Sequence, residues 1–416
     1  MDKVKKTQRT LLAINALKII LTIFTTTFFT SYIVALTPDN ILGRGVLNIG
    51  IFYLSQFVVY MIVYFVLSKF VAKSNRVSYL RLGILVNGLL LVALIFFGDE
   101  ISKWIPLAGG LIGIADAFYN SSYLVMKNEL VKRKNISSFN IVSSVLTNLI
   151  NIVVPIVLGY MIDVTTFSYI AIYVVVIVAV QFGISFAISS QRPVRTSFKL
   201  KEYFSFLKED KDAKNKVKWT YINAIFAGFK NTYKVLIVIL TIYIFKTNLS
   251  LGILTSIFSI TTTILLILFK RFENHRKMNR LVVYMIISIF PVVCCLCFVF
   301  LQEKISLILL NFALTVAIQF SEYGSNCERD AIIKNLNKYE YIAHHQFLCE
   351  AFMCASRLFS YIIFILVGLL ADITAFTILL IILISLNPIK FVIMFKQTQV
   401  RKSIESEMIK EAESKE

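Results

Sequence analysis

The chain has 416 residues, of which 57% are hydrophobic and 16% are charged, and its mean hydropathy is +0.76. This composition excludes a single water-soluble core and indicates an all-α polytopic membrane protein. The formal net charge of +19 could suggest a nucleic-acid partner, but the basic residues fall in the gaps between apolar runs. Because inner loops of membrane proteins are basic, we predict a lipid bilayer as partner and no nucleic acid.

Apolar runs that reach the roughly 20 residues needed to span a bilayer recur about twelve times along the chain. The predicted spans are 11–36, 46–68, 80–98, 104–126, 139–162, 167–189, 219–245, 249–269, 281–301, 304–326, 347–370 and 373–395. The first run follows basic residues, as a secretion signal does, but it is too long and no small-residue cleavage site follows it. The pattern predicts six spans on each side of a polar stretch.

The polar stretch 191–218 is rich in lysine and arginine, which is typical of a cytoplasmic loop. Its apolar residues Leu200, Tyr203, Phe204 and Leu207 recur at helical spacing. We expect a helix there, either on the inner leaflet with its lysines against anionic lipid, or as a solvated connector. The predicted domains are an N-terminal six-helix half (1–190), a basic linker (191–218), a C-terminal six-helix half (219–395) and a tail (396–416).

The gaps between spans indicate orientation. The gaps after the second, fourth and eighth spans contain several lysines and arginines, whereas the alternate gaps, such as 37–45 and 163–166, are short and nearly free of them. The basic gaps therefore belong inside, and both termini are predicted to be cytoplasmic. Abundant Lys, Ile and Asn residues are typical of an AT-rich bacterial genome, so we expect a bacterial plasma membrane. We also expect the protein to be a monomer.

The two halves repeat each other in sequence. The segment 157–167, which closes the fifth span, matches 366–376, which closes the eleventh, and the shared residues include Gly159 with Gly368 and Asp163 with Asp372. At nearly the same offset, Ile14-Asn15-Ala16 matches Ile222-Asn223-Ala224. Two matches at nearly one offset indicate a six-plus-six duplication in which both halves have the same orientation.

Two six-helix halves, a basic central loop, cytoplasmic ends and the matched glycine and aspartate residues resemble the major facilitator superfamily (MFS) of secondary transporters. The resemblance covers about residues 8 to 395. The family's motif between the second and third spans is degenerate here, because 67–76 keeps the basic residues but lacks the glycine and the acid, and only Gly83 fits the glycine in the third span. The resemblance implies alternating access by two halves around a central cavity.

Ionisable residues inside apolar spans are the informative side chains, because each costs roughly 2.5–3.5 kcal/mol near the bilayer centre. Asp116 lies about halfway along its span and shares a helical face with Gly109 and Gly113, while Lys230 and Lys234 lie mid-span in 219–245. Such residues usually have a partner or face a water-filled cavity.

Two other ionisable residues lie nearer to the ends of their spans. Lys18, about two turns from the edge of the first span, is expected either to face the cavity or to snorkel to the membrane surface. Glu322 is expected either to face the cavity or to act as a gate by pairing with Arg329. It belongs to a polar stripe at helical spacing, formed by Asn311, Thr315, Gln319, Glu322 and Asn326.

The resemblance places the first, fourth, seventh and tenth spans around the central cavity, and polar residues occur on all four. We predict that Asp116 and Glu322 couple transport to protons, since a lysine next to a carboxylate controls its protonation. The predicted substrate-binding residues are Lys18, Asn15, Tyr119, Asn120, Tyr123, Lys230, Lys234, Asn311, Thr315, Gln319 and Arg357. A polar network, serving either as cavity wall or as a lock between helices, is predicted for Asn148, Asn151 and Glu350.

The predicted function is secondary active transport of a small organic solute, coupled to protons, with an anionic or zwitterionic substrate favoured by the excess of cations over acids. One alternative is efflux of drugs or metabolites, or flipping of a lipid-linked substrate along aromatic walls formed by Phe28, Phe29, Tyr32, Tyr119 and Tyr123. Another is a receptor or assembly partner that does not transport. No enzymatic activity, cofactor or metal is predicted, because no nucleophile, phosphate-binding loop or zinc-spaced histidine pair occurs.

Overall fold

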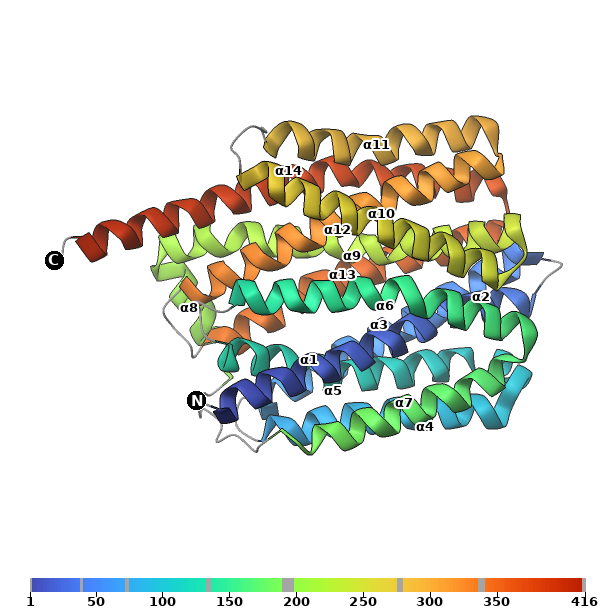
Figure 1. Ribbon diagram of the computed structural model, residues 1–416, viewed down its shortest axis with the longest axis horizontal. Coiled ribbons are helices and arrows are strands. Elements are labelled where there is room, and N and C mark those ends of the chain that lie inside the picture. The colour runs from blue at the N-terminus through green and yellow to red at the C-terminus, as the bar shows by residue number, and fades with distance from the viewer. Residues whose placement is uncertain are drawn as a thin grey trace.

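The computed structural model describes residues 2–37, 40–71, 75–131, 136–188, 198–274, 280–335 and 341–413. These residues are almost entirely helical (Figure 1). The elements are α1 (Asp2–Ile23), the π-helical turn η1 (Phe24–Phe28), α2 (Phe29–Ala35), the π-helical turn η3 (Ile41–Gly45), α3 (Val46–Val71), α4 (Arg76–Phe97), the 3-10 helix η4 (Gly98–Trp104), α5 (Ile105–Leu130), α6 (Ile136–Val164), α7 (Phe167–Ser185), α8 (Leu200–Glu209), α9 (Lys211–Phe245), α10 (Asn248–Asn274), α11 (Arg280–Leu301), α12 (Lys304–Asn335), α13 (Ile342–Leu370) and α14 (Ile373–Glu413).

Within the described residues, twelve helical segments are long and apolar enough to cross a membrane, with α1, η1 and α2 together forming the first. This confirms the predicted all-α polytopic fold. Helices are the expected solution, because backbone groups in lipid must bond to each other. Several helices extend beyond their predicted spans; for example, α9 begins at Lys211 rather than at 219, and α14 continues past 395 to Glu413. Mixed basic and acidic residues at these two ends favour helix in water as well.

The helices form two groups, α1 to α7 (the N-terminal half) and α9 to α14 (the C-terminal half), in one elongated bundle (Figure 1). Both termini lie at the same end of the bundle as α8, which we call the linker end; the opposite end is the far end. The halves contact each other mainly through two helix pairs, α6 with α10 and α3 with α13. These two pairs are related by the internal repeat of the sequence.

Glycines make the two inter-half pairs possible. A Cβ placed on Gly159 or Gly252 would lie within 2.5 Å of a backbone oxygen on the partner helix, where no side chain fits. A Cβ on Gly368 would lie 2.7 Å from the backbone nitrogen of Leu47, and one on Gly50 would lie 2.6 Å from Ile365. Small residues that allow close backbone approach are the usual basis of helix association in membranes. The repeated Gly159 and Gly368 therefore mark equivalent junctions between the halves.

At the far end, a capping carboxylate joins the halves. Asp163, at the end of α6, accepts hydrogen bonds from the backbone N–H groups of Asn248 (3.1 Å) and Leu249 (2.8 Å), which begin α10. The Asn248 side chain also donates to Asp163 (2.9 Å) and accepts from the Ser31 hydroxyl on α2 (2.5 Å). A carboxylate at a helix N-terminus satisfies orphan N–H groups and complements the helix dipole. Asp372, its counterpart in the repeat, instead accepts from its own Thr374 N–H.

Several aromatic residues predicted as cavity walls are core residues instead. Phe28 and Phe29 are each 1% exposed, and Phe29 packs edge-on against Phe52. Tyr32 stacks on Phe167 with ring centroids 4.3 Å apart. Their burial follows from the close packing of the first span against α3 and α7 near the far end. These rings stabilise the N-terminal half and do not supply an aromatic lining.

The linker helix α8 forms within the predicted linker. Its apolar face packs against α9 and α13 of the protein rather than facing lipid or water. Tyr203 is fully buried, and its hydroxyl lies 2.7 Å from that of Tyr221 on α9 and 3.3 Å from Nδ1 of His345 on α13. Burial raises the pKa of Tyr203. Phe204, which was predicted on the apolar face, is 52% exposed. Phe206 instead packs against the protein, with its ring stacked on that of Tyr341. The apolar face of α8 was predicted from residue spacing alone, and spacing does not show whether lipid, water or protein lies against that face.

The stretch just before α8 is fixed to α13 as well. The backbone N–H of Lys199 donates to Nε2 of His344 at 2.8 Å, and the ring of Phe198 stacks on that of His344 with centroids 4.7 Å apart. The linker segment from residue 198 onward is therefore part of the C-terminal half. The other predicted basic stretches at 72–74, 132–135, 189–197 and 275–279 lie outside the described residues.

Candidate functional site

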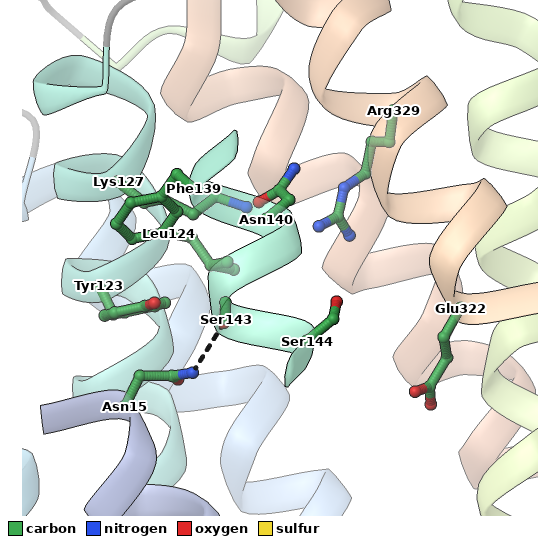
Figure 2. A pocket seen from close by; sticks show the side chains of 10 residues that line it. All are labelled: Asn15, Tyr123, Leu124, Lys127, Phe139, Asn140, Ser143, Ser144, Glu322 and Arg329. Carbon is green, nitrogen blue, oxygen red and sulfur yellow. Dashed lines mark hydrogen bonds between the residues drawn. The ribbon is translucent and has the colours of Figure 1, made fainter. Parts of the chain in front are cut away.

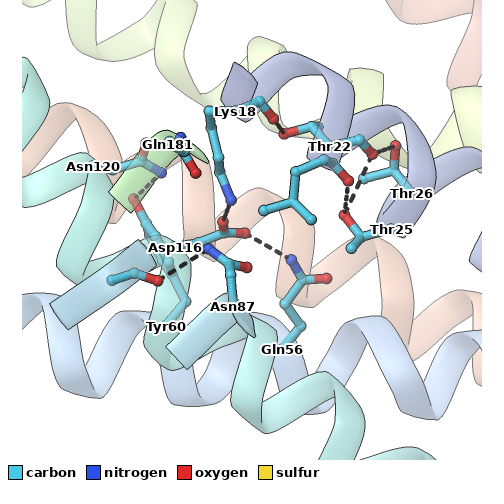
Figure 3. A network of polar contacts seen from close by, with 12 residues as sticks. Lys18, Thr22, Thr25, Thr26, Gln56, Tyr60, Asn87, Asp116, Asn120 and Gln181 are labelled. Carbon is cyan, nitrogen blue, oxygen red and sulfur yellow. Dashed lines mark hydrogen bonds and ion pairs between the residues drawn. The ribbon is translucent and has the colours of Figure 1, made fainter. Parts of the chain in front are cut away.

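A buried ion pair lies within the N-terminal half (Figure 3). The ammonium of Lys18 on α1 donates to Oδ1 of Asp116 on α5 at 2.7 Å, and the two side chains are only 11% and 22% exposed. Gln56 on α3 donates to the other carboxylate oxygen at 3.2 Å, and the Lys18 ammonium lies 5.5 Å from the ring centre of Tyr119. The pairing directs the Lys18 ammonium to Asp116 inside the bundle rather than to the membrane surface.

Close packing of α3 against α5 brings Gln56 within reach of Asp116. A Cβ placed on Gly113 would lie 2.3 Å from the carbonyl oxygen of Gln56, and one on Gly109 would lie 2.3 Å from that of Phe52. These glycines share the Asp116 face, as predicted from their spacing. Their role is to let the two backbones touch, so that a short amide side chain reaches the carboxylate.

A second ion pair lies within the C-terminal half and has different composition. Lys230 on α9 donates to Oε1 of Glu322 on α12, and the ammonium of Lys234, one turn further along α9, lies 3.8 Å from the same oxygen. Lys390 on α14 is 4% exposed and donates to the hydroxyl of Ser321 at 2.5 Å. It interacts electrostatically with Glu322, Lys230 and Lys234. One carboxylate thus faces three lysines.

A polar bridge joins the halves between the two pairs. The hydroxyl of Tyr60 on α3 donates to Oε2 of the buried Glu350 on α13 at 2.9 Å, and it accepts a long 3.5 Å bond from Asn120 on α5. About two turns further along α13, the guanidinium of Arg357 lies 4.8 Å from the ring centre of Phe57 on α3. Both contacts join α13 to α3 and therefore join the two halves.

A cavity of about 180 Å³ lies between the halves, on the side of the ion pairs nearest the linker end (Figure 2). In Figure 2, Glu322 and Arg329 of α12 face it from the C-terminal half, opposite Asn15, Tyr123 and residues of α6. The amide of Asn15 donates to Ser143 in this wall at 3.4 Å. Arg329 lines the same cavity as Glu322, but the ion pair of Glu322 is with Lys230. Lys127 adds a second basic residue to the lining.

The predicted site residues are thus brought together in two groups rather than one. Asp116 binds Lys18 within one half and Glu322 binds Lys230 within the other, and no ion pair among the described residues joins the two groups. In the polar stripe of α12, the Thr315 hydroxyl donates to the backbone carbonyl of Asn311, so it is engaged locally, and the side chains of both Asn311 and Gln319 are half-buried. The side chain of Asn326 lies outside the described residues.

The predicted network of Asn148, Asn151 and Glu350 is not assembled. Asn148 and Asn151 lie on α6, which packs against α1 and α10, whereas Glu350 lies on α13, which packs against α3 and α9. Glu350 bonds to Tyr60 instead. The repeat relates α6 to α13 as equivalent helices on opposite sides of the bundle, so residues at matched positions are far from each other rather than in contact.

Sequence reasoning missed three polar residues of these groups. Lys390 lies in the last span, and a test for ionisable residues inside every span would have found it. Gln56 and Tyr60 lie one turn apart on α3, and this polar pair in an otherwise apolar run was the available signal. Both were missed because uncharged polar residues are common in transmembrane helices and carry weak information by themselves.

Comparison with known proteins agrees with this architecture. The family model of the Major Facilitator Superfamily matches residues 19–326. No curated protein sequence matches the chain. Among solved structures, the chain is similar to a bacterial homologue of the iron transporter ferroportin in an inward-facing state, with 12% identity, a TM-score of 0.62, and coverage of 95% of this chain and 98% of that one.

Two structures of POT family transporters are similar as well. One, in complex with a thioalcohol-conjugated peptide, has 10% identity and a TM-score of 0.66 over 93% of this chain and 95% of that one. The other, in complex with 5-aminolevulinic acid, has 12% identity and a TM-score of 0.62 over 96% of each chain. At these identities the likeness concerns the fold. Together with the family match over most of its length, it shows that this chain belongs to the Major Facilitator Superfamily and is a membrane transporter rather than an enzyme.

Proposed function

We propose that this protein is a secondary transporter that moves a small anionic organic solute by alternating access, coupled to protons. The observation that carries the proposal is the charge of the polar groups between the halves. Lys18 and Asp116 neutralise each other, but Glu322 and Glu350 stand against Lys230, Lys234, Lys390 and Arg357. Uncompensated cations inside a membrane protein favour an anionic ligand, because the ligand removes the cost of an unpaired charge.

The arrangement of the halves supports alternating access. The cavity lies toward the linker end, while Asp163, Asn248 and Ser31 join the halves at the far end. We place the linker end in the cytoplasm on the basis of its lysines and arginines, so this arrangement corresponds to an inward-facing state. Opening the far end requires the α6–α10 contacts there to separate while the linker end closes.

Proton coupling is proposed for Asp116 and Glu322. Each carboxylate is held by a lysine of its own half, so each pair forms without the substrate. When an anionic substrate draws Lys230 or Lys234 away from Glu322, the carboxylate loses its main source of stabilisation and gains affinity for a proton. The same conformational state of the transporter then binds both the proton and the anion, which is the requirement for coupling.

Efflux or lipid flipping receives less support. The aromatic residues Phe28, Phe29 and Tyr32, which would have formed an apolar wall, are part of the core. Tyr123 does line the cavity, together with Leu124 and Phe139, but the other lining residues are asparagines, serines, one acid and two basic residues. This polar lining is suited to a small charged solute rather than to an acyl chain.

The proposal is tested by uptake into proteoliposomes. A panel of labelled organic anions, zwitterions and cations would be offered to wild-type protein with an inward proton gradient from about pH 6 to about pH 8, and with no gradient. We expect an anion to accumulate only with the gradient, and accumulation to be lost in Lys230→Gln and Asp116→Asn. Lys396→Gln, an exposed lysine on α14, is the matched control and should accumulate normally. Accumulation of cations alone, or flux that is indifferent to both variants, would contradict the proposal.

A further inference from the structure

The basic cluster of the C-terminal half, which we define as Lys230, Lys234 and Lys390 around Glu322, is compact. Lys230 and Lys234 both approach the same oxygen, Oε1 of Glu322. Lys390 reaches the neighbouring residue, Ser321, and is close enough to interact electrostatically with all three other members of the cluster. Three lysines and one glutamate leave a formal excess of two positive charges in one small volume.

This excess has no compensation among the described side chains of the C-terminal half. The remaining acid on the facing helices, Glu350, is bonded to Tyr60 on α3. Arg357, which also interacts electrostatically with Lys230, adds to the positive charge. The Nε of Arg357 is buried and has no hydrogen-bond partner in the described part of the chain. A buried donor without an acceptor costs about 1–3 kcal/mol, so a ligand oxygen is expected there.

We propose that the basic cluster binds a doubly charged phosphate group, carried by a phosphomonoester or by inorganic phosphate. The inference rests on the proposed function and specifies the class of anion. A monoanion would leave one of the two excess charges uncompensated. A dicarboxylate carries its two charges on separate groups, whereas two of the three ammonium groups of this cluster converge on one oxygen atom. Lysine ammonium groups are point-charge donors that suit a tetrahedral phosphate approached from several directions.

The basic cluster adjoins the cavity through Glu322, which lines the cavity wall together with the basic residues Lys127 and Arg329. Basic residues that line a cleft raise the local concentration of anions. Ser321 supplies a hydroxyl that Lys390 already contacts, and such a hydroxyl can donate to a phosphate oxygen. In this arrangement Glu322 occupies the position of the ligand and competes with it for Lys230 and Lys234.

Thermal stabilisation of the purified full-length protein tests the proposal, because a ligand that binds the folded state raises its melting temperature. The probes are inorganic phosphate, glycerol phosphate, succinate and acetate at equal ionic strength and about pH 7.5, where phosphate is mostly doubly charged. We expect the two phosphates to stabilise at concentrations at least tenfold lower than succinate or acetate. Stronger stabilisation by glycerol phosphate identifies an organic phosphomonoester as the ligand, and the reverse identifies inorganic phosphate.

Variants locate the binding. Lys234→Gln, whose side chain is 47% exposed and therefore tolerates replacement, and Lys390→Gln should each weaken phosphate binding at least tenfold. Lys390→Arg, which keeps the charge, covers the case in which the glutamine variant fails to fold. Lys396→Gln on the same helix should bind as wild type does. Unchanged phosphate binding in the cluster variants would overturn the site.

The outcomes separate this inference from the proposed function. If succinate stabilises better than phosphate and Lys234→Gln abolishes the effect, the phosphate assignment is wrong while anion transport stands. If no anion shifts the melting temperature and uptake of anions is also absent, both are wrong. If phosphate binds the cluster but no uptake follows, the site stands and the transport proposal fails.

Discussion

In the N-terminal half Lys18 faces one carboxylate, whereas in the C-terminal half Glu322 faces three lysines. The first group is neutral and its carboxylate is further held by Gln56, so it is complete without a ligand. The second carries an excess of positive charge, which an anion would neutralise in the proposed function. Duplicated halves have thus kept the same helices but acquired different electrostatics. In the proposed function this difference assigns anion binding to the C-terminal half, while Asp116 in one half and Glu322 in the other both take up protons.

The largest effect is expected when Glu322 is replaced by Gln. Removing one partner of a buried ion pair costs about 3–5 kcal/mol, and here it leaves three lysines without a carboxylate. Thermal unfolding in detergent should show a large loss of stability without ligand, and added phosphate should restore part of it. Glu100→Gln, an exposed acid, is the control. A smaller loss than in Asp116→Asn would contradict the proposed difference between the halves.

Double replacement sharpens the comparison. Asp116→Asn alone leaves one buried lysine and should cost about 3 kcal/mol, while Lys18→Gln with Asp116→Asn should recover most of that loss, because no charge remains. The corresponding pair in the other half, Lys230→Gln with Glu322→Gln, still leaves Lys234 and Lys390 together and should recover little. Double-mutant cycles on unfolding measure both recoveries. Equal recovery in the two halves would show that the lysine excess has no energetic consequence.

The far-end cap gives a second contrast between repeated residues. Asp163→Asn weakens the cap across the halves and should cost about 1 kcal/mol, enough to raise the open fraction of the far end roughly fivefold. Asp372→Asn affects only its own helix and should leave closure unchanged. Distances between spin labels at Leu36 and Lys246, in a cysteine-free background, report the opening. An equal response to both replacements would show that the cap does not hold the halves together.

The smallest expected effect concerns the linker. His344→Phe keeps a ring for Phe198 to stack on but removes the acceptor of the Lys199 N–H, which should cost about 0.5–1.5 kcal/mol. Hydrogen exchange should then become faster by roughly threefold to tenfold in α8, with no change in α3 or α5. Phe204→Ala, which removes an exposed ring from the same helix, is the control and should leave exchange unchanged. Unchanged protection in His344→Phe would show that α8 is held by Tyr203 alone.

The fold was predictable because the bilayer limits the possible structures. Apolar runs of sufficient length identify the spans, and the repeat of Gly159 and Gly368 indicated two equivalent halves. Even the function of these glycines, close contact of helix backbones, follows from residue size.

The pairing of the buried charges was not predictable to the same degree. Asp116, Lys230 and Glu322 were found as ionisable residues in spans, but their partners depend on how each helix is rotated about its axis, which a sequence does not specify. A span ending at 395 also places Lys390 within about two turns of the membrane surface, where snorkelling would account for it. Its 4% exposure and its contact with Ser321 show that this lysine is instead buried in the bundle.

The glycine junctions between the halves also determine when the molecule can be completed during its synthesis. α3 and α6 are made early, but the helices that cover their glycine faces, α13 and α10, belong to the second half of the chain, and α13 is the last span but one. Until α13 is made, the face of α3 at Gly50 lacks the helix that covers it. The nascent N-terminal half therefore keeps an uncovered glycine face on each side, and its contacts with the C-terminal half can be completed only after α13 has been made.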